Sequence, residues 1–154
     1  MKTNILRLIV LVISISCVTM LSAQEKSLRK YTMMDGVECV NLSKELLSLI
    51  PASKDSKFEG FVDKIDNVQI IKTQKKKLVK KFKKEWPKVL ETEDYNSIMS
   101  MNQDGKNLHL FSKANPNGTS TFILIAMEKT ELNLIAVTGT LTQEDVNAIQ
   151  EIMK

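Results

Sequence analysis

The most unusual chemistry of this chain lies in a run of lysines between Lys72 and Lys88. Nine of these 17 residues are lysine and Glu85 is the only acid, so the segment carries a formal charge of +8. The formal charge of the whole chain is only +4, so the positive charge is concentrated in one place. Such a field is suited to binding anionic lipid, anionic polysaccharide or an acidic protein.

The same segment has the spacing of an amphipathic helix, which we predict from Gln74 to about Glu91. Its apolar residues form one stripe: Leu78, Val79, Phe82, Trp86 and then Val89 or Leu90. Lysines cover the remaining arc, and six of them are the candidate binding residues, called here the lysine face: Lys76, Lys77, Lys80, Lys81, Lys84 and Lys88. We expect Pro87 to kink this helix or to end its first part.

Two interpretations of the lysine face stay open. In the first it is the solvated side of a helix whose other side is core, because a chain with 20 Lys and two Arg uses lysine wherever a cation is tolerated. In the second it is a binding site. Five like-charge pairs stand four residues apart, from Lys72–Lys76 to Lys84–Lys88. Each costs about 0.2–0.5 kcal/mol, and a chain that keeps this repulsion has a use for the field.

Residue types for catalysis are sparse. His109 is the only histidine, and Cys39 is the only cysteine after Cys17, so they form the one conceivable thiol–imidazole pair. No local signature supports it: a lone thiol in an apolar strand is typical of a small buried residue, and His109 of a surface or edge residue. No G-x-S-x-G motif and no glycine-rich phosphate loop is present. We therefore predict no enzyme, no catalytic residue and no cofactor.

The acids Glu91, Glu93 and Asp94 cluster behind the lysine helix and could hold calcium weakly. At the end of a basic helix, however, such acids more simply balance local charge and start a turn. The sequence therefore predicts no metal site.

The first 23 residues are typical of a secretory signal peptide. A short positive region precedes an uncharged 14-residue run, Leu8–Leu21, and small residues follow it. As a helix this run would measure about 21 Å, which is short of the roughly 30 Å hydrocarbon core of a bilayer. We therefore predict cleavage between Ala23 and Gln24, which leaves residues 24–154.

We expect residues 24–154 to form a single globular domain, periplasmic or associated with the cell envelope. No later segment approaches 18 consecutive apolar residues, so we expect no transmembrane segment in the mature chain. Cys17 raises the alternative of a lipoprotein, but Ser14-Ile15-Ser16 is a poor approach to a lipidated cysteine. Nucleic acid is a poor partner after export, since Arg29 alone remains for bidentate base contacts.

The remaining pattern predicts an α+β fold in which helices pack on an antiparallel sheet. Strands are expected over residues 37–42, 67–72, 95–101, 107–112, 121–127 and 132–138, the last four as a meander. Short helices are expected over 26–34 and 44–50, and a C-terminal helix from Thr142 to Met153. The strand at 121–127 is apolar on both faces, which indicates an inner strand. In the strand at 95–101 we expect Tyr95, Ser97, Met99 and Met101 to share a face.

Two segments together, Tyr31–Leu47 and Leu132–Val146, resemble an exported bacterial family known as domain of unknown function 4252. That family is associated with a signal peptide, a G-V-x-x-V-x-[IL]-S-K element, a basic middle helix and a closing strand–Gly–helix. The matching residues here are Gly36, Val37, Val40, Leu42, Ser43 and Lys44 in the first element, and Gly139, Leu141, Glu144 and Asp145 in the last. The resemblance would cover nearly all of residues 26–154. It implies the fold class and export but no activity.

The sequence therefore predicts an exported, non-enzymatic binding or interaction module with an envelope protein as partner. The alternative is an electrostatic binder of anionic envelope surfaces, lipid or polysaccharide, that uses the lysine face. The oligomeric state stays open.

Overall fold

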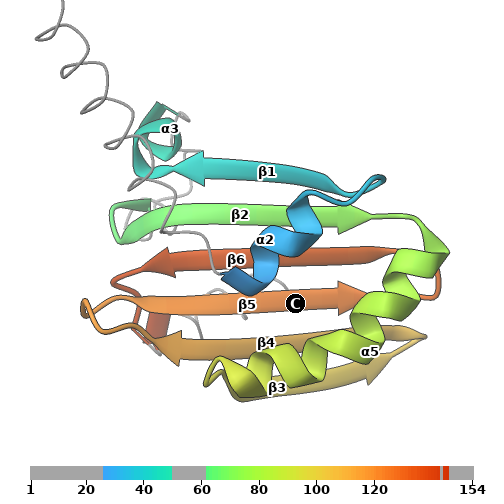
Figure 1. The fold of residues 1–154 in the computed structure, drawn as a ribbon. Helices are drawn as coiled ribbons and strands as arrows, with labels where there is room; N and C mark the ends of the chain where they lie inside the picture. The colour runs from blue at the N-terminus through green and yellow to red at the C-terminus, as the bar shows by residue number, and fades with distance from the viewer. Residues whose placement is uncertain (1–25, 50–61, 143, 146–154) are drawn as a thin grey trace, which may run out of the picture. The chain divides into compact units, whose positions relative to one another are not determined.

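The computed structural model describes residues 26–49, 62–142 and 144–145, which belong to two compact units. The first unit ends at Met34 and contains one described helix, α2 (Lys26–Thr32). The second unit begins at Asp35 and contains every other described element (Figure 1). The predicted signal peptide, its cleavage site at Ala23–Gln24 and Cys17 lie outside the described residues.

The second unit is built on one six-stranded antiparallel sheet, so the predicted α+β class is confirmed. The strands are β1 (Glu38–Ser43), β2 (Ile65–Thr73), β3 (Asn96–Gln103), β4 (Lys106–Ala114), β5 (Ser120–Met127) and β6 (Leu132–Gly139). Their order across the sheet is β1-β2-β6-β5-β4-β3. The last four strands form the predicted meander, and β2 pairs with its far strand β6.

The inner strands supply the core. β5 lies between β4 and β6, as its apolar sequence predicts, and its Ile123 and Ile125 are 1% and 0% exposed. Leu134 of β6 pairs with both Ile125 and Ile71 of β2, and all three are fully buried. Because side chains alternate along a strand, these residues point to one face of the sheet.

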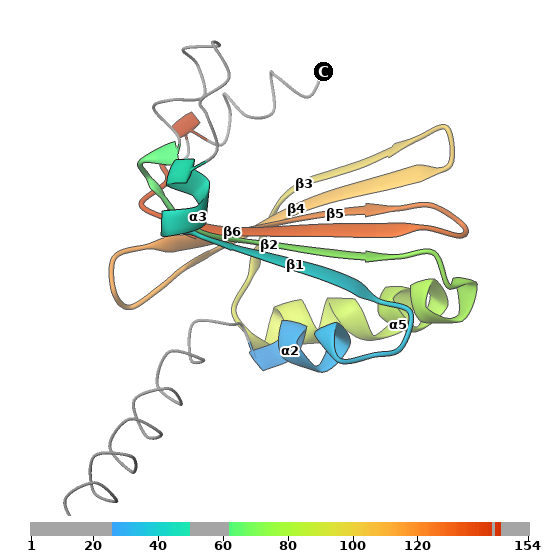
Figure 2. The ribbon, with the colours of Figure 1, turned by 90° about the horizontal axis from the view of Figure 1, so that it is seen from above.

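The long helix α5 (Lys76–Thr92) covers that face (Figure 2). Its apolar stripe is buried at Val79, Phe82, Trp86 and Leu90, which is the helical spacing expected for a helix lying on a sheet. The rings of Phe82 and Trp86 also contact each other, with centroids 5.6 Å apart.

The opposite face of the sheet has its own cluster, in which Leu110, Phe122 and Leu141 are buried together. The short helix α3 (Lys44–Leu49) follows β1 directly and contacts β1 and β2. Of the predicted C-terminal helix, the structure describes only its first residues. There Asp145 accepts hydrogen bonds from the backbone N–H and the hydroxyl of Thr142, both at 2.8 Å. Residues 146–154 lie outside the described residues, and so does most of that helix.

The prediction that Tyr95, Ser97, Met99 and Met101 share a face was wrong. The register of β3 against β4 shifts between Ser97 and Met99, because a β-bulge inserts one extra residue there. Ser97 pairs with Phe111 and therefore shares the face that α5 covers, whereas Met99 lies on the opposite face.

The long helix begins at Lys76, two residues later than expected. It continues through Pro87 and ends at Thr92, one residue after the predicted end at about Glu91. Proline at position 87 cannot donate a hydrogen bond to the carbonyl of Lys83. The helix continues because Trp86 and Leu90, on either side of the proline, are both buried. No helix among the described residues is long and apolar enough to cross a membrane.

Candidate functional site

The lysine face lies on the solvent side of α5. All seven lysines of this helix are exposed: Lys76, Lys77, Lys80, Lys81, Lys83, Lys84 and Lys88. Lys83 lies beside the buried stripe and lines the space under the helix, whereas the six predicted binding residues cover the remaining arc and are together on one helix. The aromatic residues of the stripe, Phe82 and Trp86, are 1% and 3% exposed and belong to the core.

Two lysines of the original run are not part of this helix. Lys72 lies in β2 and forms an ion pair with Glu131, at 3.2 Å. Lys75 precedes α5 and forms an ion pair with Asp35, at 2.6 Å. The expected Lys72–Lys76 repulsion along a helix is therefore wrong. Four like-charge pairs remain on α5, with a summed cost of about 0.8–2 kcal/mol.

The carboxylates that form ion pairs in the described chain lie outside α5, although the helix also carries two acids of its own, Glu85 and Glu91. Five lysines outside the helix form ion pairs: Lys44 with Asp66, Lys64 with Asp145, Lys72 with Glu131, Lys75 with Asp35 and Lys106 with Glu128. Within the part of the chain that the structure describes, none of the seven α5 lysines forms one. These exposed ammonium groups therefore give the solvent side of α5 a positive potential.

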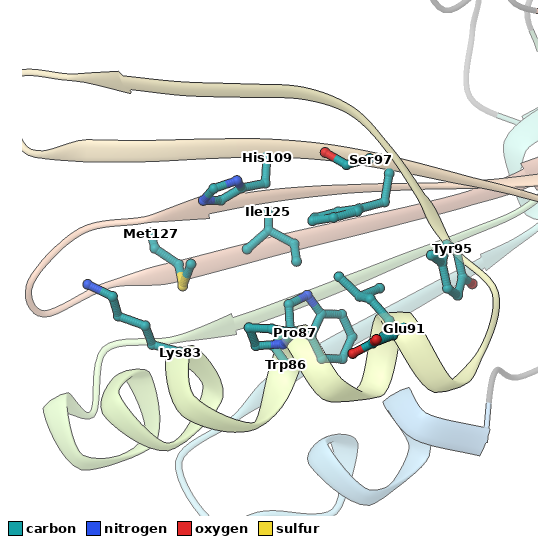
Figure 3. A pocket seen from close by; sticks show the side chains of 11 residues that line it. Lys83, Trp86, Pro87, Glu91, Tyr95, Ser97, His109, Ile125 and Met127 are labelled. Carbon is teal, nitrogen blue, oxygen red and sulfur yellow. The ribbon is translucent and has the colours of Figure 1, made fainter.

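A cavity of ≈ 310 Å³ lies under the same helix, between α5 and strands β3, β4 and β5 (Figure 3). Sequence reasoning did not predict it. The residues around it, which define the α5 cavity, are Lys83, Trp86, Pro87, Leu90, Glu91, Tyr95, Ser97, His109, Phe111, Ile125 and Met127. Its walls are mostly apolar, with polar groups around the edge, which is the usual composition of a small-molecule site.

The polar groups of the cavity are separated. Lys83 and His109 lie at one end, and Glu91 and Tyr95 lie at the other (Figure 3). The Nδ1 atom of His109 lies 3.0 Å from the hydroxyl oxygen of Ser100. Of the two expected positions for His109, an edge strand was wrong, because β4 is the second strand of the sheet; the side chain is half-buried at the surface of that strand.

The structure does not bring the thiol and the imidazole together. Cys39 lies on β1 and His109 on β4, with β2, β6 and β5 between these two strands. Four strand spacings of about 4.8 Å separate them by roughly 19 Å. The expectation of a buried thiol was also wrong, since Cys39 is exposed on an edge strand, where the side-chain amide of Gln69 lies 3.7 Å from its sulfur. A cysteine–histidine catalytic pair is therefore not formed.

The three acids that could have held calcium, Glu91, Glu93 and Asp94, lie where α5 ends. The backbone N–H of Glu93 donates to the carbonyl of Val89, and that of Asp94 donates to Glu91, while Asp94 adopts a positive φ of 60°. Among the described residues, no group of three or more histidine, cysteine or carboxylate side chains is placed to hold a metal ion.

Comparison with known proteins gives one match. A family model described as "Domain of unknown function (DUF4252)" matches residues 31–149, which include the whole sheet, α5 and both segments of the sequence resemblance. No curated protein and no solved structure matches the chain significantly. This chain belongs to the DUF4252 family.

Proposed function

We propose that the protein is an exported, non-enzymatic binding module that attaches to an anionic lipid surface through the lysine face of α5. The signal-peptide pattern of residues 1–23 supports export to the cell envelope. The observation on which the binding proposal rests is the segregation of charge within the described chain: five lysines outside α5 form ion pairs with carboxylates, and the seven lysines of α5 form none.

The composition of the exposed arc favours lipid over a protein partner. Tight protein interfaces depend on a few aromatic and arginine anchors that fill pockets on the partner. The α5 arc offers no arginine, and its two aromatic residues, Phe82 and Trp86, are in the core. A row of exposed ammonium groups from Lys76 to Lys88, about 18 Å long, instead matches a surface where only charge density is recognised.

The expected affinity is modest. Each lysine near an anionic membrane contributes about 1 kcal/mol. About five lysines of one helix can approach a surface together, which gives roughly 5 kcal/mol and a Kd near ~0.2 mM. Because Phe82 and Trp86 cannot insert into lipid without leaving the core, attachment is electrostatic and readily reversed. It should weaken as added salt shortens the Debye length.

The test is co-sedimentation of residues 24–154 with anionic and with neutral vesicles, at low and at about physiological salt. The proposal expects pelleting with anionic vesicles only, and less of it as salt rises. The triple variant Lys76→Glu, Lys80→Glu, Lys84→Glu should lose it. A matched triple variant away from the helix, Lys44→Glu, Lys106→Glu, Lys129→Glu, makes the same change in net charge and should retain most of it. Failure of the wild-type chain to pellet with anionic vesicles at low salt overturns the proposal.

A further inference from the structure

The α5 cavity is a second candidate site, and none of the six lysines of the lysine face lines it. Its volume of ≈ 310 Å³ is at the lower end of the range for small-molecule pockets, roughly 300–1,000 Å³. Trp86 and Leu90 of the helix form one wall, and Phe111 and Ile125 of the sheet form the other. A ligand there would have an apolar body of modest size.

The walls of the cavity are held apart by the fold itself. On the helix side, Trp86 is fixed by its contact with Phe82, and the backbone N–H of Tyr95 donates to the carbonyl of Leu90 at 3.0 Å. On the sheet side, the bulge in β3 turns Ser97 toward the helix. Figure 2 shows β3 and β4 diverging from α5. The cavity is therefore preformed, which lowers the cost of binding.

Hydrogen-bond donors gather at one end. The side chain of Lys83 extends from α5 toward the sheet at the end where the ring of His109 lies (Figure 3). When the Ser100 hydroxyl donates to Nδ1 of His109, across 3.0 Å, the neutral imidazole holds its proton on Nε2. An ammonium group and an N–H donor together match a carboxylate.

The other end of the α5 cavity disfavours an anionic group. Glu91 carries a negative charge there and disfavours an anionic head group. The exposed lysines near Lys83 on the helix, Lys80 and Lys84, strengthen the positive potential at the donor end. The charges therefore fix one orientation for an anionic ligand.

We propose that the α5 cavity binds a small amphiphilic carboxylate, with its apolar chain between Trp86 and Phe111 and its carboxylate at Lys83 and His109. This inference goes beyond attachment to a lipid surface, because Lys83 is outside the lysine face and the ligand is a single small molecule.

Octanoate is a suitable probe, and its binding can be followed by the fluorescence of the protein itself. Trp86 is the only tryptophan and lines the cavity, so its fluorescence measures occupancy directly. Titration of residues 24–154 should give a saturable change with a Kd of about 1 mM or tighter. Octanol has the same chain without the charge and should bind about tenfold more weakly, as should octylamine.

Two substitutions on α5 distinguish a local contact of the ligand with Lys83 from attraction by the overall positive charge of the helix. Lys83→Met removes the ammonium at the cavity and should weaken octanoate binding about tenfold, with little effect on octanol. Lys81→Met makes the same change in charge outside the cavity and should leave both affinities within about twofold. The variant Ser97→Trp, at an exposed position of β3, should fill the cavity and abolish both.

The outcomes decide between binding and its absence. A saturable change that Lys83→Met weakens and Lys81→Met does not supports the proposal. A response that is absent or linear, equal affinity for octanol, or equal effects of the two lysine variants overturns it. Vesicle binding does not enter these measurements, so the two proposals can fail separately. A thermal unfolding curve of each variant establishes that it is folded.

Discussion

The carboxylate of Asp145 lies 2.7 Å from the ammonium of Lys64, and this ion pair joins the end of the described chain to the residue before β2. Asp145 also accepts two hydrogen bonds from Thr142. The hydrogen bond from Lys64 is the largest cause that lowers the pKa of Asp145, from 3.8 to about 2, and the bonds from Thr142 add to it. The pair therefore has a predictable dependence on pH.

The first prediction concerns acid stability. A carboxyl group whose pKa is depressed in the folded state contributes stability that is fully present above its unfolded pKa and is lost as pH falls through the folded pKa. For Asp145 that window lies between about pH 4 and pH 2. Thermal unfolding midpoints measured across this window should fall more steeply for the wild-type chain than for Asp145→Asn.

Glu144→Gln is the control for this prediction. It removes a charge from the adjacent exposed residue, which forms no ion pair within the described chain. Its acid profile should follow that of the wild type. Parallel profiles for Asp145→Asn and the wild type would show that the ion pair does not contribute to stability.

The second prediction concerns Gly139, where β6 meets the residue before β2. A Cβ atom on this glycine would overlap the backbone carbonyl oxygen of Lys64 and lie 2.9 Å from the Cα of Ile65. Neither backbone atom can move without disturbing the pairing of β2 with β6. Gly139→Ala should therefore lower the free energy of unfolding by about 2–3 kcal/mol in urea.

Gly105→Ala is the comparison for that measurement. Gly105 has a φ of 81° in the β3–β4 turn but open space around it, so only its backbone preference is lost. Its cost should be about 1 kcal/mol. Equal costs at the two sites would mean that the sheet yields at Gly139.

The third prediction concerns the thiol. Because Cys39 is exposed on the edge strand β1, it should react with a thiol reagent in the folded protein at a rate close to that of a free thiol. His109→Gln should leave this rate unchanged, since the two residues are roughly 19 Å apart. A rate that falls in His109→Gln would require a fold in which β1 and β4 approach each other.

The strands and the long helix could be predicted from the sequence because their patterns are local. The stripe of Phe82 and Trp86 marks a buried helix face, and Ile123 and Ile125 mark an inner strand, whatever the rest of the chain does. Their partners, by contrast, are set by the tertiary fold. Strand order makes β1 an edge, and this exposes Cys39 although it lies among apolar residues.

The bulge in β3 and the α5 cavity could not be predicted either, because both depend on how strands pair in the tertiary fold. Serine and methionine alternate weakly around Ile98, so a shift of one residue leaves no signature in the hydrophobic pattern. The cavity depends on that bulge and on the pairing of β4 with β5, which brings His109 beside Ile125. A lone histidine between two leucines gives no sign of this environment.

The last prediction separates stability from binding at one lysine. Lys80 stands four residues from both Lys76 and Lys84, so Lys80→Glu replaces two repulsive pairs with two attractive ones. The free energy of unfolding should rise by about 0.8–2 kcal/mol at low salt, and this gain should shrink in high salt. Vesicle binding should weaken at the same time. Lys129→Glu, which changes the net charge equally outside α5, should show neither effect. A variant that gains stability and keeps its vesicle binding would mean that the repulsion among these lysines is unrelated to lipid attachment.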